Sequence, residues 1–372
     1  MEKINIAVVG AGLIGKSHIK LLTSDNSNYA LFAIVDPTDE GRELAKSLGV
    51  PWYSKLETMF SNSDSNSSER SKKPDGVILA TPNHLHVEQA IACLEAGIPA
   101  IIEKPVAHSL SEGERLYRIA QNYSTPLLVG HHRMHSPIMR KAKELIDSGS
   151  LGATVAVTGS ALFYKPDDYF ELGTWRTKIG GGPILINMIH EIGNLRYLCG
   201  EISSVQATAS NTHRGFEVED TVAIVFSFSN GTLGTFILSD TAGSARSWEQ
   251  TAQENKSYAT YPDEDCYHIA GTHGSLSVPT LKLKRYLKDE DRSWWKPFEC
   301  SDVKLERTDP LEAQLHHFCN VIRGLAEPLV SVHDGVQNLR VTEAIVEAVK
   351  SGEKVFIQTP PFQDLESAQG RK

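Results

Sequence analysis

The chain has 372 residues, of which 40% are hydrophobic and 22% charged, and these proportions exclude collagen-like and wholly disordered proteins. Its 46 acidic residues exceed its 37 basic ones, and the resulting net charge of −9 argues against nucleic acid as a partner. No run approaches the roughly 18 apolar residues of a membrane helix, and the five cysteines are widely spaced with no CxxC pair. We therefore expect a cytoplasmic protein with no membrane partner, long enough for two or three domains.

Strand-like and helix-like stretches alternate in the first third of the chain. Apolar, β-branched runs predict strands at Ile4–Val9, Tyr29–Val35, Gly76–Ala80, Pro99–Ile102 and Pro126–Gly130. Helical periodicity predicts helices at Ile14–Leu22, Asp39–Leu48, His86–Ala96 and Ser111–Asn122. This alternation is typical of a doubly wound parallel sheet, so we expect a Rossmann domain over residues 1–128. The Ser/Asn-rich segment Ser61–Lys73 interrupts the pattern and is predicted to be a surface loop.

The rest of the chain, residues 129–372, has the pattern of a second α/β domain. Period-two alternation predicts strands at Thr154–Phe163, Ser203–Asn211, Val222–Phe228, Thr232–Ser239, Tyr267–Ala270, Gly274–Pro279 and Lys282–Tyr286. Helices are predicted at Ile138–Ser148, Ile184–Leu198, Pro310–Arg323 and Val336–Ser351. Alternating strands joined by Gly turns favour a mostly antiparallel sheet with one exposed face.

A glycine motif follows the first strand. Gly10-Ala11-Gly12-Leu13-Ile14-Gly15 is a GxGxxG that opens the first predicted helix, which is the arrangement of a dinucleotide-binding turn. Gly10 permits the tight turn, Gly12 lets the backbone approach a pyrophosphate, and Gly15 lets helix and strand pack closely. The helix start at Leu13 and Ile14 would offer N–H donors to the phosphates. A glycine-rich turn without a ligand is the alternative.

Asp36 ends the second predicted strand, 21 residues after Gly15. A carboxylate at this distance typically accepts hydrogen bonds from the adenosine ribose and repels a 2′-phosphate, so NAD is expected as the cofactor and NADP less so. Two observations complicate this prediction. Asp36-Pro37 is also a common turn pair, and Arg42 could offer a partner to a phosphate.

Two further segments follow strands at the same sheet edge. In Ala80-Thr81-Pro82-Asn83-His84-Leu85-His86, Thr81, Asn83 and His86 are candidate cofactor contacts, although a helix start explains the same residues. In Glu103-Lys104-Pro105, desolvation in a crevice would lower the pKa of Lys104 and suit it to proton transfer. Glu103 would hold the cofactor ribose or orient Lys104. A lone lysine here is otherwise a surface charge.

These motifs, in this order and spacing, resemble the glucose–fructose oxidoreductase/inositol dehydrogenase (Gfo/Idh/MocA) family. Trp175-Arg176, the triplet Gly180–Gly182 and a later helix with His190 resemble the signature of the family's second domain. The resemblance implies a large open sheet used in homo-oligomers, dimers or tetramers. It also implies NAD(P)-dependent oxidation of a secondary alcohol on a sugar, cyclitol or related polyol, or the reverse reduction. Lys104 and His190 match the family's catalytic lysine and histidine.

The sequence departs from the family beside His190. Many members have an aspartate four residues earlier, where this chain has Ile186, and the carboxylate expected three residues later is Gly193. Asn187 lies three residues before His190 on the same helical face and is expected to position the substrate, because an amide does not ionise. By default, a histidine on an apolar helix is a satisfied core residue, which is the alternative for His190.

Four other residues are candidates for binding. Arg176 and Trp175 are expected near the cofactor, and Arg133 and Tyr164 near the substrate. No metal is expected, because the spacing of His131, His132 and His135 lacks the pairing of a zinc helix. The polar segment Ser244–Tyr258, with Trp248 and Glu249, would shape the pocket or a subunit contact.

Taken together, the residues and the resemblance predict an NAD(P)-dependent dehydrogenase that acts on CH–OH groups. Two alternatives stay open. The substrate could be a cyclic dihydrodiol, or the protein could be a non-catalytic NAD-binding sensor.

Overall fold

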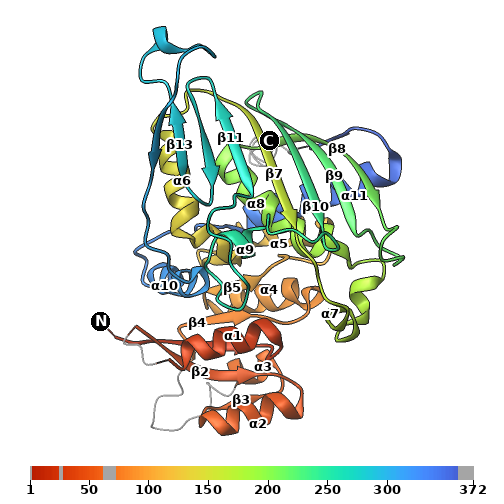
Figure 1. Cartoon of the computed structure of the whole chain (residues 1–372). Helices are drawn as coiled ribbons and strands as arrows, with labels where there is room; N and C mark the ends of the chain where they lie inside the picture. Colours follow the sequence, from red (N-terminus) through yellow and green to blue (C-terminus); the bar gives the residue numbers. More distant parts are fainter. Residues whose placement is uncertain (1, 25–27, 62–72, 359–372) are drawn as a thin grey trace, which may run out of the picture.

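The computed structural model describes residues 2–24, 28–61 and 73–358, and two sheets dominate it (Figure 1). A six-stranded parallel sheet lies at the bottom of this view and a nine-stranded sheet at the top. The predicted combination of a Rossmann domain with a mostly antiparallel second sheet is confirmed. The loop predicted at Ser61–Lys73 lies outside the described residues, apart from its two ends.

The first sheet has the strand order β3-β2-β1-β4-β5-β6, and every neighbouring pair is parallel. The strands are β1 (Ile4–Val9), β2 (Tyr29–Val35), β3 (Trp52–Tyr53), β4 (Gly76–Leu79), β5 (Ala100–Glu103) and β6 (Leu127–Gly130). The helices are α1 (Leu13–Leu22), α2 (Asp39–Leu48), α3 (Leu56–Ser61), α4 (His86–Ala96) and α5 (Leu110–Ala120). Strand order reverses beside β1, and ligands of doubly wound sheets bind at the carboxyl ends of the strands there.

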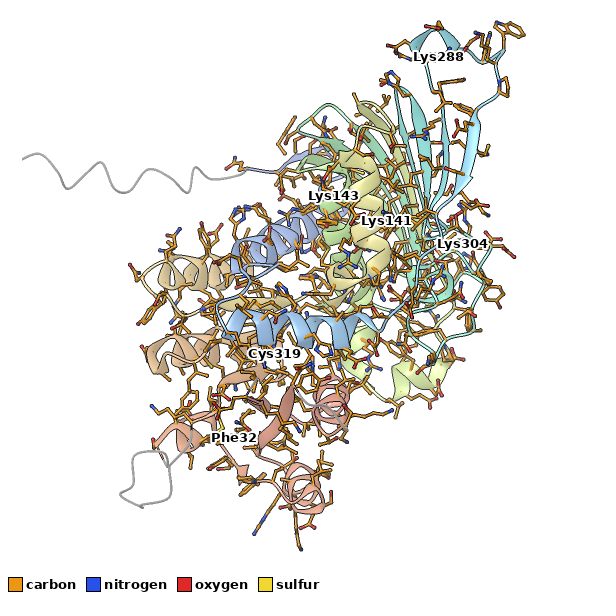
Figure 2. The ribbon with its side chains drawn as sticks, turned by 90° about the vertical axis from the view of Figure 1, so that its left-hand side faces the viewer. Phe32, Lys141, Lys143, Lys288, Lys304 and Cys319 are labelled. Atoms are coloured by element: carbon orange, nitrogen blue, oxygen red, sulfur yellow. The ribbon has the colours of Figure 1, made fainter. Side chains whose placement is uncertain are left out.

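A helix from late in the chain covers part of this sheet. α10 (Pro310–Ile322) buries Leu315, Phe318 and Cys319 against Ile78 and other residues of the parallel sheet. In Figure 2 the label of Cys319 marks this helix beside the strands of the first sheet. The chain therefore returns to its first domain after residue 309, whereas the division into residues 1–128 and 129–372 stays a prediction.

The second sheet has the order β14-β13-β12-β11-β7-β10-β9-β8-β15, and only β7 and β10 run parallel. Its strands are β7 (Thr154–Leu162), β8 (Ile202–Ser210), β9 (Thr221–Phe228), β10 (Leu233–Ser239), β11 (Tyr267–Gly271), β12 (Gly274–Val278), β13 (Lys282–Arg285), β14 (Glu299–Asp302) and β15 (Val355–Phe356). Inward residues such as Val222, Ile224 and Phe226 are buried, while Ala223 and Val225 between them are exposed. The alternation follows from the two-residue period of a strand with one covered face.

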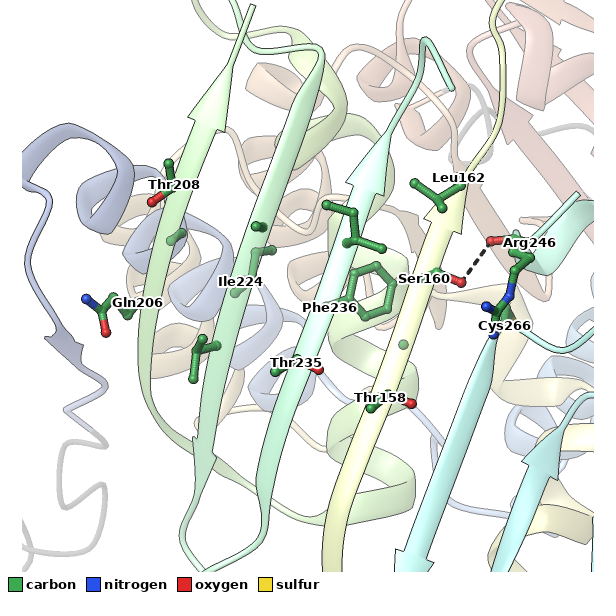
Figure 3. Close-up of a pocket in the computed structure, with 15 residues that line it drawn as sticks. Thr158, Ser160, Leu162, Gln206, Thr208, Ile224, Thr235, Phe236, Arg246 and Cys266 are labelled. Carbon is green, nitrogen blue, oxygen red and sulfur yellow. Dashed lines mark hydrogen bonds between the residues drawn. The ribbon is translucent and has the colours of Figure 1, made fainter. Parts of the chain in front are cut away.

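Helices α6 (Pro137–Asp147), α8 (Ile189–Cys199) and α11 (Val332–Ser351) lie on the covered side of this sheet (Figure 1). The other side holds a shallow pocket over β7 to β10, into which Thr158, Gln206 and Thr235 point (Figure 3). Smaller elements are η2 (Asn83–Leu85), η3 (His132–His135), α7 (Asp167–Glu171), η4 (Thr174–Thr177), the π-helical turn η5 (Ile184–Met188), α9 (Trp248–Thr251) and η6 (Asp289–Asp291). In the described ranges, no helix is long and apolar enough to span a bilayer.

Candidate active site

The glycine motif forms the turn between β1 and α1. Gly10 has φ +93°, and a Cβ there would lie 2.6 Å from the carbonyl oxygen of Ala80. A Cβ on Gly15 would lie 1.9 Å from the carbonyl oxygen of Gly10, so only glycine fits either place. Gly12 is the N-cap of α1, faces open space, and leaves the first turn without a side-chain cap or an acidic residue. An uncapped helix start next to open space suits an anion such as a pyrophosphate.

Asp36 lies at the end of β2, beside this turn. Its Oδ2 accepts a 2.7 Å hydrogen bond from the backbone N–H of Ala11, and its Oδ1 accepts hydrogen bonds from Thr38. Burial alone would raise the pKa of Asp36, but these hydrogen bonds outweigh it and lower the pKa. The carboxylate is therefore ionised at neutral pH. Arg42 packs over Trp52, with its guanidinium carbon 5.4 Å from the ring centroid.

The segment after β4 contains both exposed and buried candidate residues. Asn83 is exposed, and the hydroxyl of Thr81 donates to Gln89 at 2.6 Å. His86 is only 1% exposed, and its ring nitrogens lie 2.8 Å from the Pro105 carbonyl oxygen and 2.9 Å from that of Thr81. The buried ring of His86 joins the two loops that follow β4 and β5, and its contact with the cofactor stays a prediction.

Glu103 closes β5 and is directed toward α1. Its Oε1 lies 2.8 Å from Nε2 of His18, and its Oε2 accepts from the backbone N–H of Lys104 at 3.2 Å. Burial would raise the pKa of Glu103, but the hydrogen bond from His18 and the charges of His18, His132 and Lys104 together outweigh it and lower the pKa. Of its two expected roles, holding the ribose has no support from this geometry. Its contact with the backbone of Lys104 fits the other role, which is to orient that residue.

Lys104 reaches from the first domain to the second. Its Nζ donates to the carbonyl oxygen of Ile186 in η5 at 3.2 Å. Burial lowers the pKa of Lys104, although the charge of Glu103 acts in the opposite direction. The ammonium thus lies one residue from Asn187, on the turn that leads directly into α8 and His190.

The glycine triplet shapes the entry to that turn. A Cβ on Gly181 would lie 2.7 Å from the Trp175 carbonyl oxygen, and Gly182 has φ +81°. Past them, Oε1 of Glu219 accepts from the backbone N–H of Ile184 at 2.8 Å, at the start of η5. The π-helical turn widens the helix where Asn187 lies, and such turns occur frequently at functional sites.

His190 lies among other histidines. Its ring centroid is 6.0 Å from that of His131 and 5.6 Å from that of His132, and the side chain is 9% exposed. Burial, together with the charges of Lys104 and Arg133, lowers the pKa of His190 well below its ordinary value. Burial also lowers the pKa of His131 to about 3 and that of His132 to about 4, so the cluster is neutral at pH 7. The described residues contain no group of His, Cys, Asp and Glu arranged to hold a metal ion.

Arg133, which the sequence predicts to bind the substrate, is buried among acidic side chains. The side chain is 4% exposed, Nη1 donates to Glu191 at 2.5 Å, and Nη2 donates to Glu249. The hydroxyl of Tyr267 donates to the other oxygen of Glu191. Arg133 is therefore the centre of a buried ion-pair network directly beside His190.

The three remaining predicted binding residues are Tyr164, Trp175 and Arg176. Tyr164 is 58% exposed and lines a surface pocket with Asp167 and Phe170, so the structure does not bring it to Asn187. Trp175 is 57% exposed. The guanidinium of Arg176 lies 3.9 Å from the ring centroid of Tyr169 and donates to the backbone carbonyl of that residue.

Lys165, next to Tyr164, is the residue that does reach Asn187. Its Nζ donates to Asn187 Oδ1 at 2.7 Å and lies 3.5 Å from Asp240 Oδ2. Sequence reasoning missed it, together with Glu191. The signal for Lys165 was its place beside Tyr164 at a strand end, where neighbouring side chains point in opposite directions.

Comparisons with known proteins agree with this architecture. Residues 4–131 match the model of an oxidoreductase family with an NAD-binding Rossmann fold, and residues 139–277 match that of the GFO/IDH/MocA C-terminal domain. The chain is 24% identical over 352 residues to the rhizopine catabolism protein MocA of Rhizobium meliloti, covering 93% of this chain and 95% of that protein. It is also 24% identical to the scyllo-inositol 2-dehydrogenase (NAD(+)) of Bacillus subtilis (strain 168), covering 94% and 95%.

Among solved structures, the scyllo-inositol dehydrogenase from Lactobacillus casei, with bound NAD(H) and scyllo-inositol, has a TM-score of 0.74. The match covers 96% of this chain and all of that one at 18% identity, so it supports the fold. The two family models cover consecutive parts of the chain, and they coincide with the parallel sheet and with most of the second sheet. On these grounds, the chain belongs to the Gfo/Idh/MocA family of oxidoreductases and has an NAD-binding Rossmann domain.

Proposed function

We propose that this protein is an NAD-dependent dehydrogenase that oxidises a secondary alcohol of a sugar, cyclitol or related polyol. The observation that carries the proposal is the contact of Lys104 with the turn that leads to His190. This contact joins the carboxyl edge of the nucleotide sheet to the helix of the second domain. Relatives named as inositol dehydrogenases support the substrate class, as does the family membership.

The residues of the first domain fit NAD. The uncapped start of α1, with open space at Gly12, would hold the pyrophosphate, and Asp36 would accept from the adenosine ribose. Thr81, Asn83, Trp175 and Arg176 are the remaining proposed contacts along this edge. When bound, NAD would accept the hydride, and the side chains of the protein would orient the substrate and take up its proton.

Lys104 would take the proton of the substrate hydroxyl as that carbon loses its hydride. An amine does this only when neutral, and burial shifts Lys104 toward that form. His190 is neutral, and its Nδ1 is buried without a partner among the described residues. We expect its ring to hydrogen-bond the same hydroxyl or a neighbouring one, which would orient the substrate.

The test is NADH formation with a panel of sugars, cyclitols and a cyclohexadiene dihydrodiol. Turnover with a polyol supports the proposal, and turnover with the dihydrodiol alone would favour the second dehydrogenase class. Binding of NAD in a thermal-shift assay without turnover of any panel member would favour the sensor.

Replacing Asp36 by alanine should narrow the preference for NAD over NADP by roughly tenfold or more. The reason is that removing a nearby carboxylate abolishes its repulsion of the 2′-phosphate, worth about 1.4 kcal/mol or more. The measurement is kcat/KM for both cofactors in the unmutated protein and the variant. Arg42→Ala is the control, because it shows whether Arg42 contributes to binding of the 2′-phosphate of NADP. Equal or better efficiency with NADP in the unmutated protein would overturn the assignment of NAD.

The exposed face of the nine-stranded sheet is the proposed surface for a homo-oligomer. Its outward side chains include Thr235 (Figure 3). Val225 and Leu233 on neighbouring strands are 48% and 60% exposed. Thr235→Arg should shift the sedimentation of the protein toward the monomer. In an oligomer packed through this face, the arginine would be buried without a partner for its charge. Arginine at the exposed Leu325, away from this sheet, should have no such effect. Unchanged sedimentation of the Thr235 variant would remove this face as the interface.

A further inference from the structure

Lys165 determines which way the side chain of Asn187 points. An ammonium can only donate hydrogen bonds, so the atom of Asn187 that lies 2.7 Å from Nζ is the amide oxygen. The amide nitrogen of Asn187 then points the other way, and among the described residues it has no hydrogen-bond acceptor. On the side that faces away from Lys165, Asn187 therefore presents N–H donors, whereas an aspartate would present only acceptors.

The contact between Lys165 and Asn187 does not simply result from an ion pair between Lys165 and Asp240. Asp240 already pairs with Arg214, whose Nε donates to its Oδ1 at 2.9 Å. Lys165 is farther from this carboxylate, at 3.5 Å, than from Asn187. The side chain of Lys165 is only 11% exposed, so its ammonium is held in place by these contacts and by the ring of Tyr169, 4.9 Å away.

Buried and half-buried cations outnumber buried and half-buried carboxylates by one around Lys165. Lys165, Arg214 and Arg176 lie close enough together to influence one another, and Asp240 and Glu219 are the carboxylates that act on Lys165. Burial lowers the pKa of Lys165 to about 8; Asp240 acts in the opposite direction, while Arg214 and Arg176 lower it further. Lys104 approaches the same turn from the first domain, and it makes no ion pair among the described residues. A carboxylate entering here would find N–H donors and an excess of cations.

We propose that Lys165 is a positioning residue that fixes Asn187 as a hydrogen-bond donor, and that the substrate is a polyol carrying a carboxylate. This inference rests on the proposed function and narrows its substrate class. The carboxylate would accept from Asn187 Nδ2 and lie near the ammonium of Lys165, while the hydroxyl to be oxidised would face Lys104. Neutral sugars of the same shape would lack the group that this arrangement recognises.

The test compares ligands that differ only in the carboxylate. Binding to the enzyme–NADH complex is measured by calorimetry for D-glucuronate against D-glucose, D-galacturonate against D-galactose, and D-gluconate against D-glucitol. At least one acid should bind more tightly than its neutral partner. Lys165→Met should weaken that acid by roughly 10- to 100-fold, the loss expected for a hydrogen bond to a charged group. The neutral partner should change little, and Lys165→Arg, which also only donates, should restore part of the preference.

Lys178→Met is the matched control. Lys178 is also a lysine paired with a carboxylate, that of Glu217, but both side chains are exposed. It should leave every affinity unchanged. Kinetics with a turned-over acid should show the effect of Lys165→Met mainly in KM. Equal weakening of acid and neutral ligand would mean that Lys165 is merely structural and would overturn the inference. Preference for the neutral partner in all three pairs, or binding of none of the six, would overturn it as well. Turnover of neutral polyols alone would contradict this inference and leave the proposed function intact.

Discussion

Replacing Lys104 by methionine should slow NAD-dependent oxidation by roughly 10²–10⁴-fold, the usual size of a general-base contribution. Methionine keeps the length of the side chain and removes the amine that contacts the carbonyl oxygen of Ile186. The affinity for NAD should change little, because the proposed contacts of the pyrophosphate and the adenosine ribose are made by Gly10–Gly15 and Asp36, not by the side chain of Lys104. The measurements are steady-state kinetics on a turned-over polyol and a titration with NAD.

The pH dependence gives a second readout of the same residue. Only the neutral amine accepts a proton, so the oxidation rate should rise with pH while Lys104 titrates and level off above its pKa. Burial lowers that pKa, so the plateau should begin below the value of about 10.4 found for free lysine. The variant should lack this rise. Lys141→Met on the surface of α6 should retain both rate and profile (Figure 2). Near-normal turnover of the Lys104 variant would require another proton acceptor.

Replacing Arg133 by methionine should lower the free energy of unfolding by about 3–5 kcal/mol, the cost of removing one partner from a buried ion pair. Glu191 is 1% exposed, and its carboxylate would lose the 2.5 Å contact with Nη1. Glu249 would lose its contact with Nη2 at the same time. Two carboxylates would then lie near each other without the cation between them.

Urea unfolding of the two proteins measures this loss. The matched control is Arg115→Met, because Arg115 also holds two glutamates, Glu88 and Glu112, but on the exposed surface. Exposed ion pairs contribute between zero and about 1 kcal/mol, so the control should stay within that range. Similar small losses in both variants would contradict the prediction that Glu191 and Glu249 depend on Arg133 to compensate their charge.

Most of the fold was predictable from local patterns. Apolar runs and helical periodicity located β1, β2, β4, β5 and β6, because fully buried strands and amphipathic helices leave clear signals in the sequence. The short strands Trp52–Tyr53, Glu299–Asp302 and Val355–Phe356 were not predicted, since two to four residues cannot establish a period. The helix Pro310–Ile322 was predicted, but its packing on the first sheet depends on tertiary contacts that no local pattern encodes.

The site was predictable where a motif ties a residue to a backbone position. Gly10 and Gly15 are examples, because only glycine fits the turn they form. Side-chain direction at the ends of strands was less predictable. The sequence pointed to Tyr164 and did not single out Lys165, and it placed Arg133 near the substrate. The structure directs Lys165 to Asn187 and surrounds Arg133 with Glu191 and Glu249. Those outcomes depend on partners 22 to 116 residues away.

The proposed hydride transfer is tested most directly by following deuterium from substrate carbon to cofactor. The enzyme is incubated with NAD and with sugars and cyclitols, neutral and carboxylated, that carry deuterium on their alcohol carbons, and the cofactor is analysed by mass spectrometry. The account predicts reduced cofactor that carries one deuterium, formed together with a ketone, and formed at a strongly reduced rate by the Lys104→Met variant. Tight binding of NAD without deuterium in the cofactor for any polyol would contradict it.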